Sequence, residues 1–171
     1  MIVKPKGCSA VTNTRQIASI EIIKDSKSAL PEYLAREQAQ ALQNMQRCEE
    51  FTPYEDTSAP YDLKLGIEDH RLVIYIRNAE GQDLNTLVLA LKPYRRIIQD
   101  YFLMLESYEQ ARQHATADKL EAIDMARRGI HNEGADLIQE RLEGKIKMDH
   151  ETARRFFTII CTLHKTHVKL A

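Results

Sequence analysis

The chain has 171 residues, 29% of them charged, and a formal net charge of −1 at pH 7. This length suits one domain whose hydrophobic core needs no disulfide or metal for stability. The balanced charge excludes recognition of DNA, RNA or acidic membranes through overall attraction, and leaves only a local basic patch for such partners.

The cysteines and the lack of long apolar runs predict a soluble, cytoplasmic protein. Cys8, Cys48 and Cys161 are too few and too scattered for a disulfide framework, and their odd number suits a reducing compartment. The first residues lack the continuous apolar segment of a signal peptide. No apolar run approaches the roughly 20 residues that a membrane-spanning helix needs.

The N-terminal part of the chain predicts an arm, a strand and a helix. Residues 1–14 are typical of a flexible arm, so we expect a single domain over residues 15–171. The β-branched run at residues 17–23 predicts a strand. Apolar residues at helical spacing after Pro31 predict a helix, and residues 52–60 predict a surface linker.

Three segments that alternate apolar and polar residues predict a β-meander after the linker. They are residues 61–67, 72–76 and 84–91. The intervening turns are short enough for hairpins, so we expect antiparallel pairing. The strand at residues 17–23 is available as a fourth strand of the same sheet.

The rest of the chain predicts three helices. The first covers residues 93–114, the second runs from an N-cap at Thr116 to Leu142, and the third begins after an N-cap at Asp149. Because strands come before helices, we expect an α+β fold. In it, a small antiparallel sheet packs against the N-terminal helix and the three C-terminal helices.

Two interior glycines, Gly129 and Gly134, weaken the prediction of the second C-terminal helix. Each costs about 1 kcal/mol relative to alanine in a helix. A break at Gly129, with Asn132 capping a new helix, would place His131, Asn132 and Glu133 in a loop. We favour the continuous helix and keep the break as the alternative.

Several segments of this chain, taken in their order along the sequence, resemble one bacterial family. The segments are KPYRRIIQDYF, ESY, EAIDMARRGIHNEG, ERLEGKI and TARRFFTIICTLH. Together they resemble the uncharacterised protein family 0262, most strongly over residues 60–164. The resemblance implies a small cytosolic bacterial protein. The family has no assigned activity, cofactor or catalytic residue, so the resemblance supplies no site.

A charged stripe runs along the apolar face of the second C-terminal helix. Asp124, Arg127 and His131 follow one another at i,i+3 and i,i+4 spacing, so they share that face. Buried charges need partners, so the stripe is either a structural network or a binding site. In a site, His131 is the candidate general base, Asp124 its orienter and Arg127 an anion clamp. His164 of the third helix faces the same core.

Each C-terminal helix also carries an arginine doublet. Neighbouring helical residues point about 100° apart, so one arginine of each doublet flanks the apolar face. By phase these are Arg95, Arg127 and Arg154, while Arg96 and Arg155 face solvent. Convergence of the first three would form a phosphate or carboxylate pocket, and the alternative is separate ion pairs. Neighbouring acids cancel the arginines, which disfavours nucleic acid as a partner.

Motifs for metals, cofactors and nucleophiles give no further site. Cys161, His164 and His167 are spaced at i, i+3 and i+6, but no second ligand pair accompanies them. We therefore predict no metal and no cofactor. Sequence motifs of nucleophilic hydrolases and of phosphate-binding loops do not occur.

The leading interpretation is a non-catalytic protein that binds a protein partner or a small anionic ligand through its C-terminal helices. The candidate binding residues are Arg95, Arg127, Arg128, His131, Asn132, Glu133, Arg154 and His164. The alternative is a small metal-independent enzyme for an anionic substrate, with His131 as base and Asp124 beside it. Tyr94, Tyr101 and Tyr108 recur every seven residues, which predicts core packing and leaves a homodimer open.

Overall fold

The structure, a computed structural model, describes residues 15–23 and 30–167. The flexible arm predicted for residues 1–14 lies outside them. Within the described ranges the elements are, in chain order, β1 (Ile17–Ile22), α1 (Glu32–Met45), β2 (Phe51–Pro53), β3 (Tyr61–Glu68), β4 (Arg71–Arg77), β5 (Leu87–Ala90), the 3₁₀ turn η1 (Lys92–Tyr94), α2 (Arg95–Ala111), α3 (Ala117–Arg141), β6 (Ile146–Met148) and α4 (His150–His167). This order confirms the α+β fold class.

The larger sheet has the strand order β1-β3-β4-β5. The predicted meander is confirmed, because β3 pairs antiparallel with β4, and β4 with β5. The predicted fourth strand is also present, but the sheet is mixed rather than wholly antiparallel. Strand β1 runs parallel to β3, with Ile20 opposite Leu63. A parallel pair needs a crossover connection, and α1 lies within the segment that joins these two strands.

A second, two-stranded sheet was not predicted. Residues Phe51–Pro53 pair antiparallel with Ile146–Met148, so β2 occupies the start of the segment expected to be a surface linker. Phe51 is fully buried, and its ring stacks on Phe156 of α4 at 6.0 Å between centroids. Strands of three residues are too short to leave an alternating pattern in the sequence.

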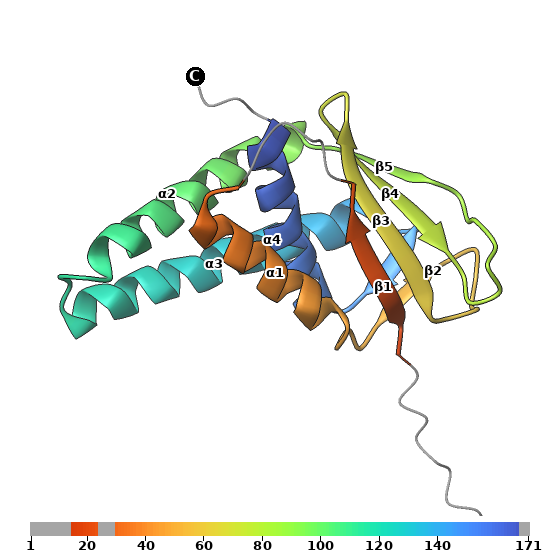
Figure 1. Ribbon diagram of the computed structural model, residues 1–171, viewed down its shortest axis with the longest axis horizontal. Coiled ribbons are helices and arrows are strands. Elements are labelled where there is room, and N and C mark those ends of the chain that lie inside the picture. The colour runs from red at the N-terminus through yellow and green to blue at the C-terminus, as the bar shows by residue number, and fades with distance from the viewer. Residues whose placement is uncertain (1–14, 24–29, 168–171) are drawn as a thin grey trace, which may run out of the picture.

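Helix α4 lies at the centre of the fold, where it packs against α1, α3 and β3. Figure 1 shows α4 between the sheet on one side and the hairpin of α2 and α3 on the other. Its inward side chains are almost fully buried and include Ala153, Phe156, Phe157, Ile160 and Cys161. Its N-cap is Asp149, as predicted, with Oδ2 accepting a hydrogen bond from the Thr152 amide at 3.2 Å.

Helix α3 runs without a break from Ala117 to Arg141. The continuous helix is therefore confirmed, and the alternative break at Gly129 is wrong. The N-cap is Thr116, whose side chain accepts a hydrogen bond from the Lys119 amide at 3.4 Å. Gly129 is exposed, whereas Gly134 is buried against α4.

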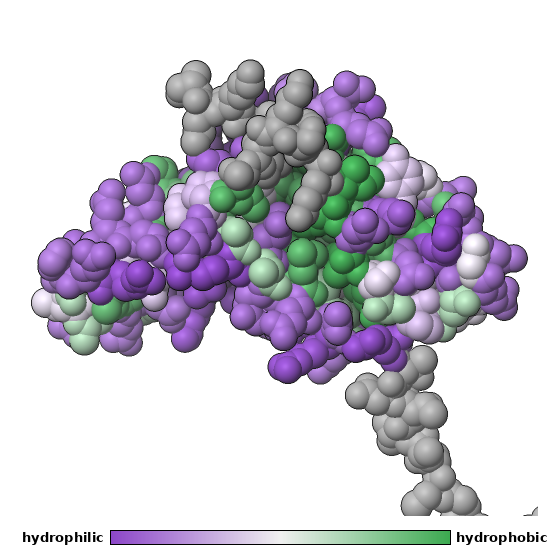
Figure 2. Space-filling view, viewed as in Figure 1, coloured by the Kyte–Doolittle hydropathy of each residue, from purple (hydrophilic) through white to green (hydrophobic). Residues whose placement is uncertain are grey.

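The surface differs between the two ends of the molecule. Figure 2 shows hydrophilic side chains over the α2–α3 hairpin and hydrophobic ones over the region of β1 and β3. The tyrosine repeat, which begins at Tyr94 of η1 and continues in α2, is only partly in the core. Tyr94 and Tyr101 are fully buried, but Tyr108 is 41% exposed. The homodimer stays a prediction. No helix within the described ranges is long and apolar enough to cross a membrane.

Candidate functional site

A cleft between α1, α3 and α4 brings several of the predicted site residues together. Its volume is about 340 Å³. We call it the arginine cleft, because Arg127 and Arg128 of α3 and Arg154 and Arg155 of α4 all line it. Helix α1 supplies the opposite wall. The remaining polar lining residues are Glu37, Gln40, Asn44, Asp124, His131, Glu151 and Thr158.

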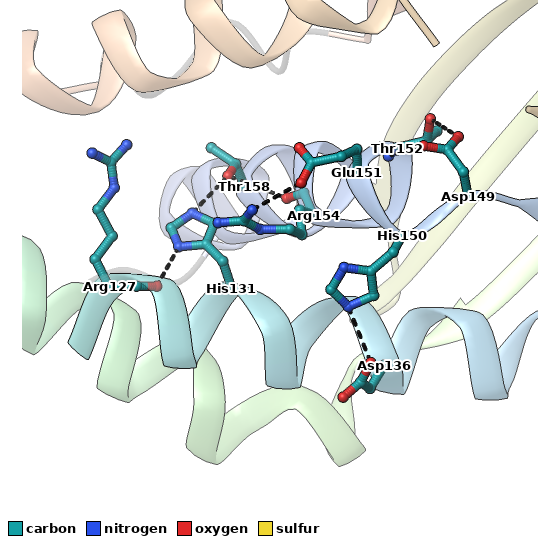
Figure 3. Close-up of polar contacts among 9 residues, drawn as sticks. All are labelled: Arg127, His131, Asp136, Asp149, His150, Glu151, Thr152, Arg154 and Thr158. Carbon is teal, nitrogen blue, oxygen red and sulfur yellow. Dashed lines mark hydrogen bonds and ion pairs between the residues drawn. The ribbon is translucent and has the colours of Figure 1, made fainter. Parts of the chain in front are cut away.

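Three of the four guanidinium groups in the cleft form ion pairs. Arg127 pairs with Glu37 at 3.5 Å, Arg128 with Asp124 at 3.0 Å, and Arg154 with Glu151 at 2.9 Å. Arg127 therefore pairs with Glu37 of α1 rather than with Asp124, its neighbour in the charged stripe, and it extends from α3 toward α1 (Figure 3). Most of these side chains are at least a third exposed, so each pair contributes about 0–1 kcal/mol.

The fourth arginine, Arg155, lies differently from the prediction. Its Nη1 donates a hydrogen bond to the backbone carbonyl of Asn44 at 3.0 Å, so the side chain spans from α4 to α1. It is half-buried, whereas the helical phase predicted that it faces solvent. Helical spacing in the sequence identifies the apolar face of α4. It does not show that α1 also covers the neighbouring side of α4, where Arg155 lies.

Arg155 also gives the arginine cleft its net charge. It pairs with no carboxylate among the residues that the structure describes, whereas the other three arginines each have one. The Nε of Arg154 is also available to a ligand, because it is buried without a hydrogen-bond partner. Four arginines and three carboxylates line the cleft, so with His131 neutral the cleft has a net charge of +1.

His131 forms the floor of the cleft and is satisfied inside the protein. Nδ1 donates to the carbonyl of Arg127 at 2.8 Å, and Nε2 accepts from the Thr158 hydroxyl at 3.1 Å (Figure 3). Burial lowers the pKa of His131 to about 4, and the neighbouring arginines act in the same direction. The imidazole is therefore neutral at pH 7. The rings of Tyr101 and Phe157 meet it edge-on.

The predicted dyad of His131 and Asp124 is not formed. Both ring nitrogens of His131 are used by other groups, and Asp124 pairs with Arg128 instead. Asp124 lies about two turns before His131 on α3, and its carboxylate remains partly exposed. Spacing placed both residues on one face, but it could not tell that the carbonyl of Arg127 is the nearer acceptor.

The other predicted site residues lie outside the arginine cleft. Asn132 and Glu133 are exposed on another face of α3, where Glu133 pairs with Arg96 of α2. Arg95 and His164 line a different cavity, so the predicted convergence of Arg95 with the arginines of α3 and α4 is wrong. Helix α2 packs on α3 and does not border the arginine cleft. The first turn of α2, which contains Arg95, therefore lies away from the cleft.

Of the triplet Cys161, His164 and His167, the side chain of His167 lies outside the described residues. Among the side chains that the structure describes, no group of three His, Cys, Asp or Glu is placed to hold a metal ion. Cys161 is fully buried, and burial raises the pKa of its thiol well above the usual value. Its surroundings are those of a small core residue.

Sequence reasoning missed the contribution of α1 to the cleft. Glu37, Gln40 and Asn44 follow one another at i,i+3 and i,i+4 spacing, so they share one face of this helix. That spacing is a signal of a polar face, but it also occurs on any solvated helix. Only the packing of α1 across α4 makes this face one wall of a site.

The fold and the cleft define a small α+β protein with an arginine-lined site. A family model described as "Uncharacterised protein family (UPF0262)" matches residues 14–166. The chain belongs to this bacterial family, as the resemblance implied. No solved structure matches the chain.

The chain is similar to several named members of the family over most of its length. It is 43% identical to a UPF0262 protein of Brucella anthropi over 157 residues, covering 91% of this chain and 97% of the relative. It is 47% identical to one of Rhodopseudomonas palustris (strain BisB18) over 131 residues, covering 77% and 80%. It is 53% identical to one of Hyphomonas neptunium over 105 residues, covering 61% and 65%.

Proposed function

We propose that this protein is a non-catalytic cytoplasmic protein that binds a small anionic ligand in the arginine cleft. The ligand would carry a phosphate or carboxylate group. The observation that carries the proposal is the arrangement of Arg155 beside three other arginines around one cavity, with no carboxylate of its own among the described residues. Guanidinium groups bind both kinds of anion through paired hydrogen bonds.

The ion pairs of the cleft do not oppose such a ligand strongly. Exposed pairs of this kind are weak, so an incoming anion can replace or share their carboxylate partners at small cost. The excess positive charge favours an anion over a neutral ligand. The cleft volume of about 340 Å³ lies near the lower end of ligand sites, about 300–1,000 Å³, and suits a compact molecule.

The state of His131 supports binding rather than acid–base catalysis. A general base needs a free lone pair within reach of the substrate. In this protein the Nε2 lone pair of His131 accepts a hydrogen bond from the Thr158 hydroxyl. The Nδ1 atom carries the ring proton and donates it in a hydrogen bond to the backbone carbonyl of Arg127. His131 therefore holds α3 against α4 beneath the ligand.

Isothermal titration calorimetry with inorganic phosphate and with citrate tests the proposal. The Arg155→Met variant keeps most of the aliphatic stem and removes the charge. The matched control is Arg112→Met, at an exposed position after α2 that does not line the cleft. We expect the first variant to weaken binding of at least one probe by about tenfold or more, and the control to bind like wild type. The absence of binding by wild type, or equal binding by both variants, would contradict the proposal.

A further inference from the structure

A second cavity is lined by residues of the β3–β4 turn, the start of α2 and the end of α4. These three segments lie at the top of the view in Figure 1. The volume of the cavity is about 510 Å³. We call it the hairpin pocket. It shares no lining residue with the arginine cleft. His164, which lines it, lies nearly three turns after Arg154, about 15 Å along α4.

Three cationic side chains line the hairpin pocket: Arg71, Lys92 and Arg95. Within residues 15–23 and 30–167 none of them forms an ion pair. Asp69 is the one carboxylate among the lining residues. The pocket therefore carries a larger positive excess than the arginine cleft, where three of the four arginines are already paired.

The backbone places these cations together. Asp69 and His70 both have positive φ, at 48° and 59°, as in the tight two-residue turns that join antiparallel strands. The next residue, Arg71, is opposite Ala90 in the β4–β5 register. The chain then turns directly through η1 into α2, so Lys92 and Arg95 follow beside Arg71.

The start of α2 adds to the positive potential of the pocket. Arg95 is the first residue of this helix, and the first turn contains no acidic residue. The amides of Tyr94 and Arg95 already donate to the carbonyls of Leu91 and Lys92, so the positive potential comes from the side-chain cations. Ile67 and Leu91 contribute apolar surface to the same cavity.

We infer that the hairpin pocket is a second anion site, which takes a phosphate monoester with an apolar organic part. The phosphate contacts Arg71, Lys92 and Arg95, because a doubly charged group can neutralise several unpaired cations at once. The organic part lies against Ile67 and Leu91, and the volume of the cavity exceeds what a phosphate alone would fill. This inference does not rest on the function proposed for the arginine cleft.

Calorimetric titration with phenyl phosphate, and separately with inorganic phosphate, tests this site. The test variant is Lys92→Gln/Arg95→Gln, and the control is Arg112→Gln/Lys119→Gln, which removes the same charge from exposed positions that do not line the pocket. We expect phenyl phosphate to bind wild type more tightly than inorganic phosphate does. The test variant should weaken its binding by about tenfold or more, and the control should leave it unchanged.

Two further variants separate the hairpin pocket from the arginine cleft and from a folding defect. Arg155→Met changes the cleft alone, so the inference predicts that this variant keeps the phenyl phosphate binding that the Lys92→Gln/Arg95→Gln variant loses. Arg71→Gln removes the third cation from another element and should also weaken binding. Absence of phenyl phosphate binding by wild type, or equal affinity in the test and control double variants, would overturn the inference. Loss of phenyl phosphate binding in Arg155→Met, with binding retained in the Lys92→Gln/Arg95→Gln variant, would also overturn it.

Discussion

Gly134 of α3 faces the ring of Phe157 of α4 so closely that a Cβ atom on the glycine would lie 2.4 Å from the ring Cγ. Side-chain contacts this short are not tolerated, so one helix or the ring would have to move. Phe157 is fully buried and meets Tyr101 and His131 edge-on, which leaves it little freedom. The glycine thus lets α3 and α4 approach at the level where His131 contacts Thr158.

The two glycines of α3 should respond oppositely to alanine. Gly134→Ala should lower the free energy of unfolding by about 1–3 kcal/mol, because overpacking outweighs the gain in helix propensity. At Gly129 the new methyl group would have no neighbour within 4 Å, so Gly129→Ala should raise the free energy of unfolding by about 0.5–1 kcal/mol. Urea denaturation followed by circular dichroism measures both. A neutral or stabilising Gly134→Ala would show that the helices are not packed so closely.

The buried His131 should make the protein less stable in mild acid. Its pKa is about 4 in the folded protein against 6.5 for the free side chain, so the unfolded chain takes up a proton first as the pH falls. The contribution to the free energy of unfolding is therefore complete above pH 6.5 and is lost progressively down to about pH 4. The total loss is about 3 kcal/mol.

The matched variant for this prediction is His131→Asn, which lacks the titrating ring and keeps an amide for the Arg127 carbonyl. Urea denaturation at several pH values should show the advantage of wild type over the variant shrinking between pH 6.5 and 4. Subtracting the free energy of unfolding of the variant from that of wild type cancels the contribution of the carboxylates that both proteins share. A difference that is constant with pH would mean that His131 is not buried as a neutral group.

Removing the carboxylate of Glu37 should strengthen anion binding in the arginine cleft. Glu37 competes with the ligand for Arg127, to which it is paired at 3.5 Å. We expect Glu37→Gln to increase the affinity for phosphate or citrate by about fivefold, the equivalent of one weak ion pair. The control is Glu32→Gln, at an exposed position of α1 outside the cleft. Weaker binding by Glu37→Gln in calorimetry would argue against an anion in this cleft.

The two cysteines in the described part of the chain should resist alkylation. Burial raises the pKa of Cys48 to about 11, and it raises the pKa of the fully buried Cys161 well above its usual value. At pH 8 both thiols therefore stay protonated and out of reach of iodoacetamide until the chain unfolds. Peptide mapping by mass spectrometry, with and without urea, measures the labelling. Rapid labelling of Cys161 in the native protein would contradict its place in the core.

Much of the fold could be predicted because the long elements carry periodic patterns. The alternation in β3 and β4 and the N-caps Thr116 and Asp149 are local signals, and they gave the correct element types. The direction of β1 depends instead on how α1 crosses back to the sheet, which no local pattern contains. The pairing of β2 with β6 likewise joins short segments far apart in the chain.

The candidate site could be predicted only on the side of α3 and α4. Helical phase correctly grouped Arg127, His131 and Arg154, because residues on one face of a helix meet the same neighbour. It misplaced Arg155, because α1 covers a side of α4 that the apolar pattern alone leaves to solvent. Arg95 flanks the apolar face of its helix as Arg127 and Arg154 flank theirs, but α2 is placed so that Arg95 lines the hairpin pocket instead of the arginine cleft.

The most direct measurement is the NMR signal of the Arg155 Nε–Hε group during a phosphate titration, assigned from its loss in the Arg155→Lys variant. An anion bound in the arginine cleft predicts a large, saturable shift of this signal with the same affinity as calorimetry. The Arg112 signal should stay in place. An Arg155 signal that does not move, or that drifts linearly with phosphate as the Arg112 signal does, would contradict anion binding in the cleft.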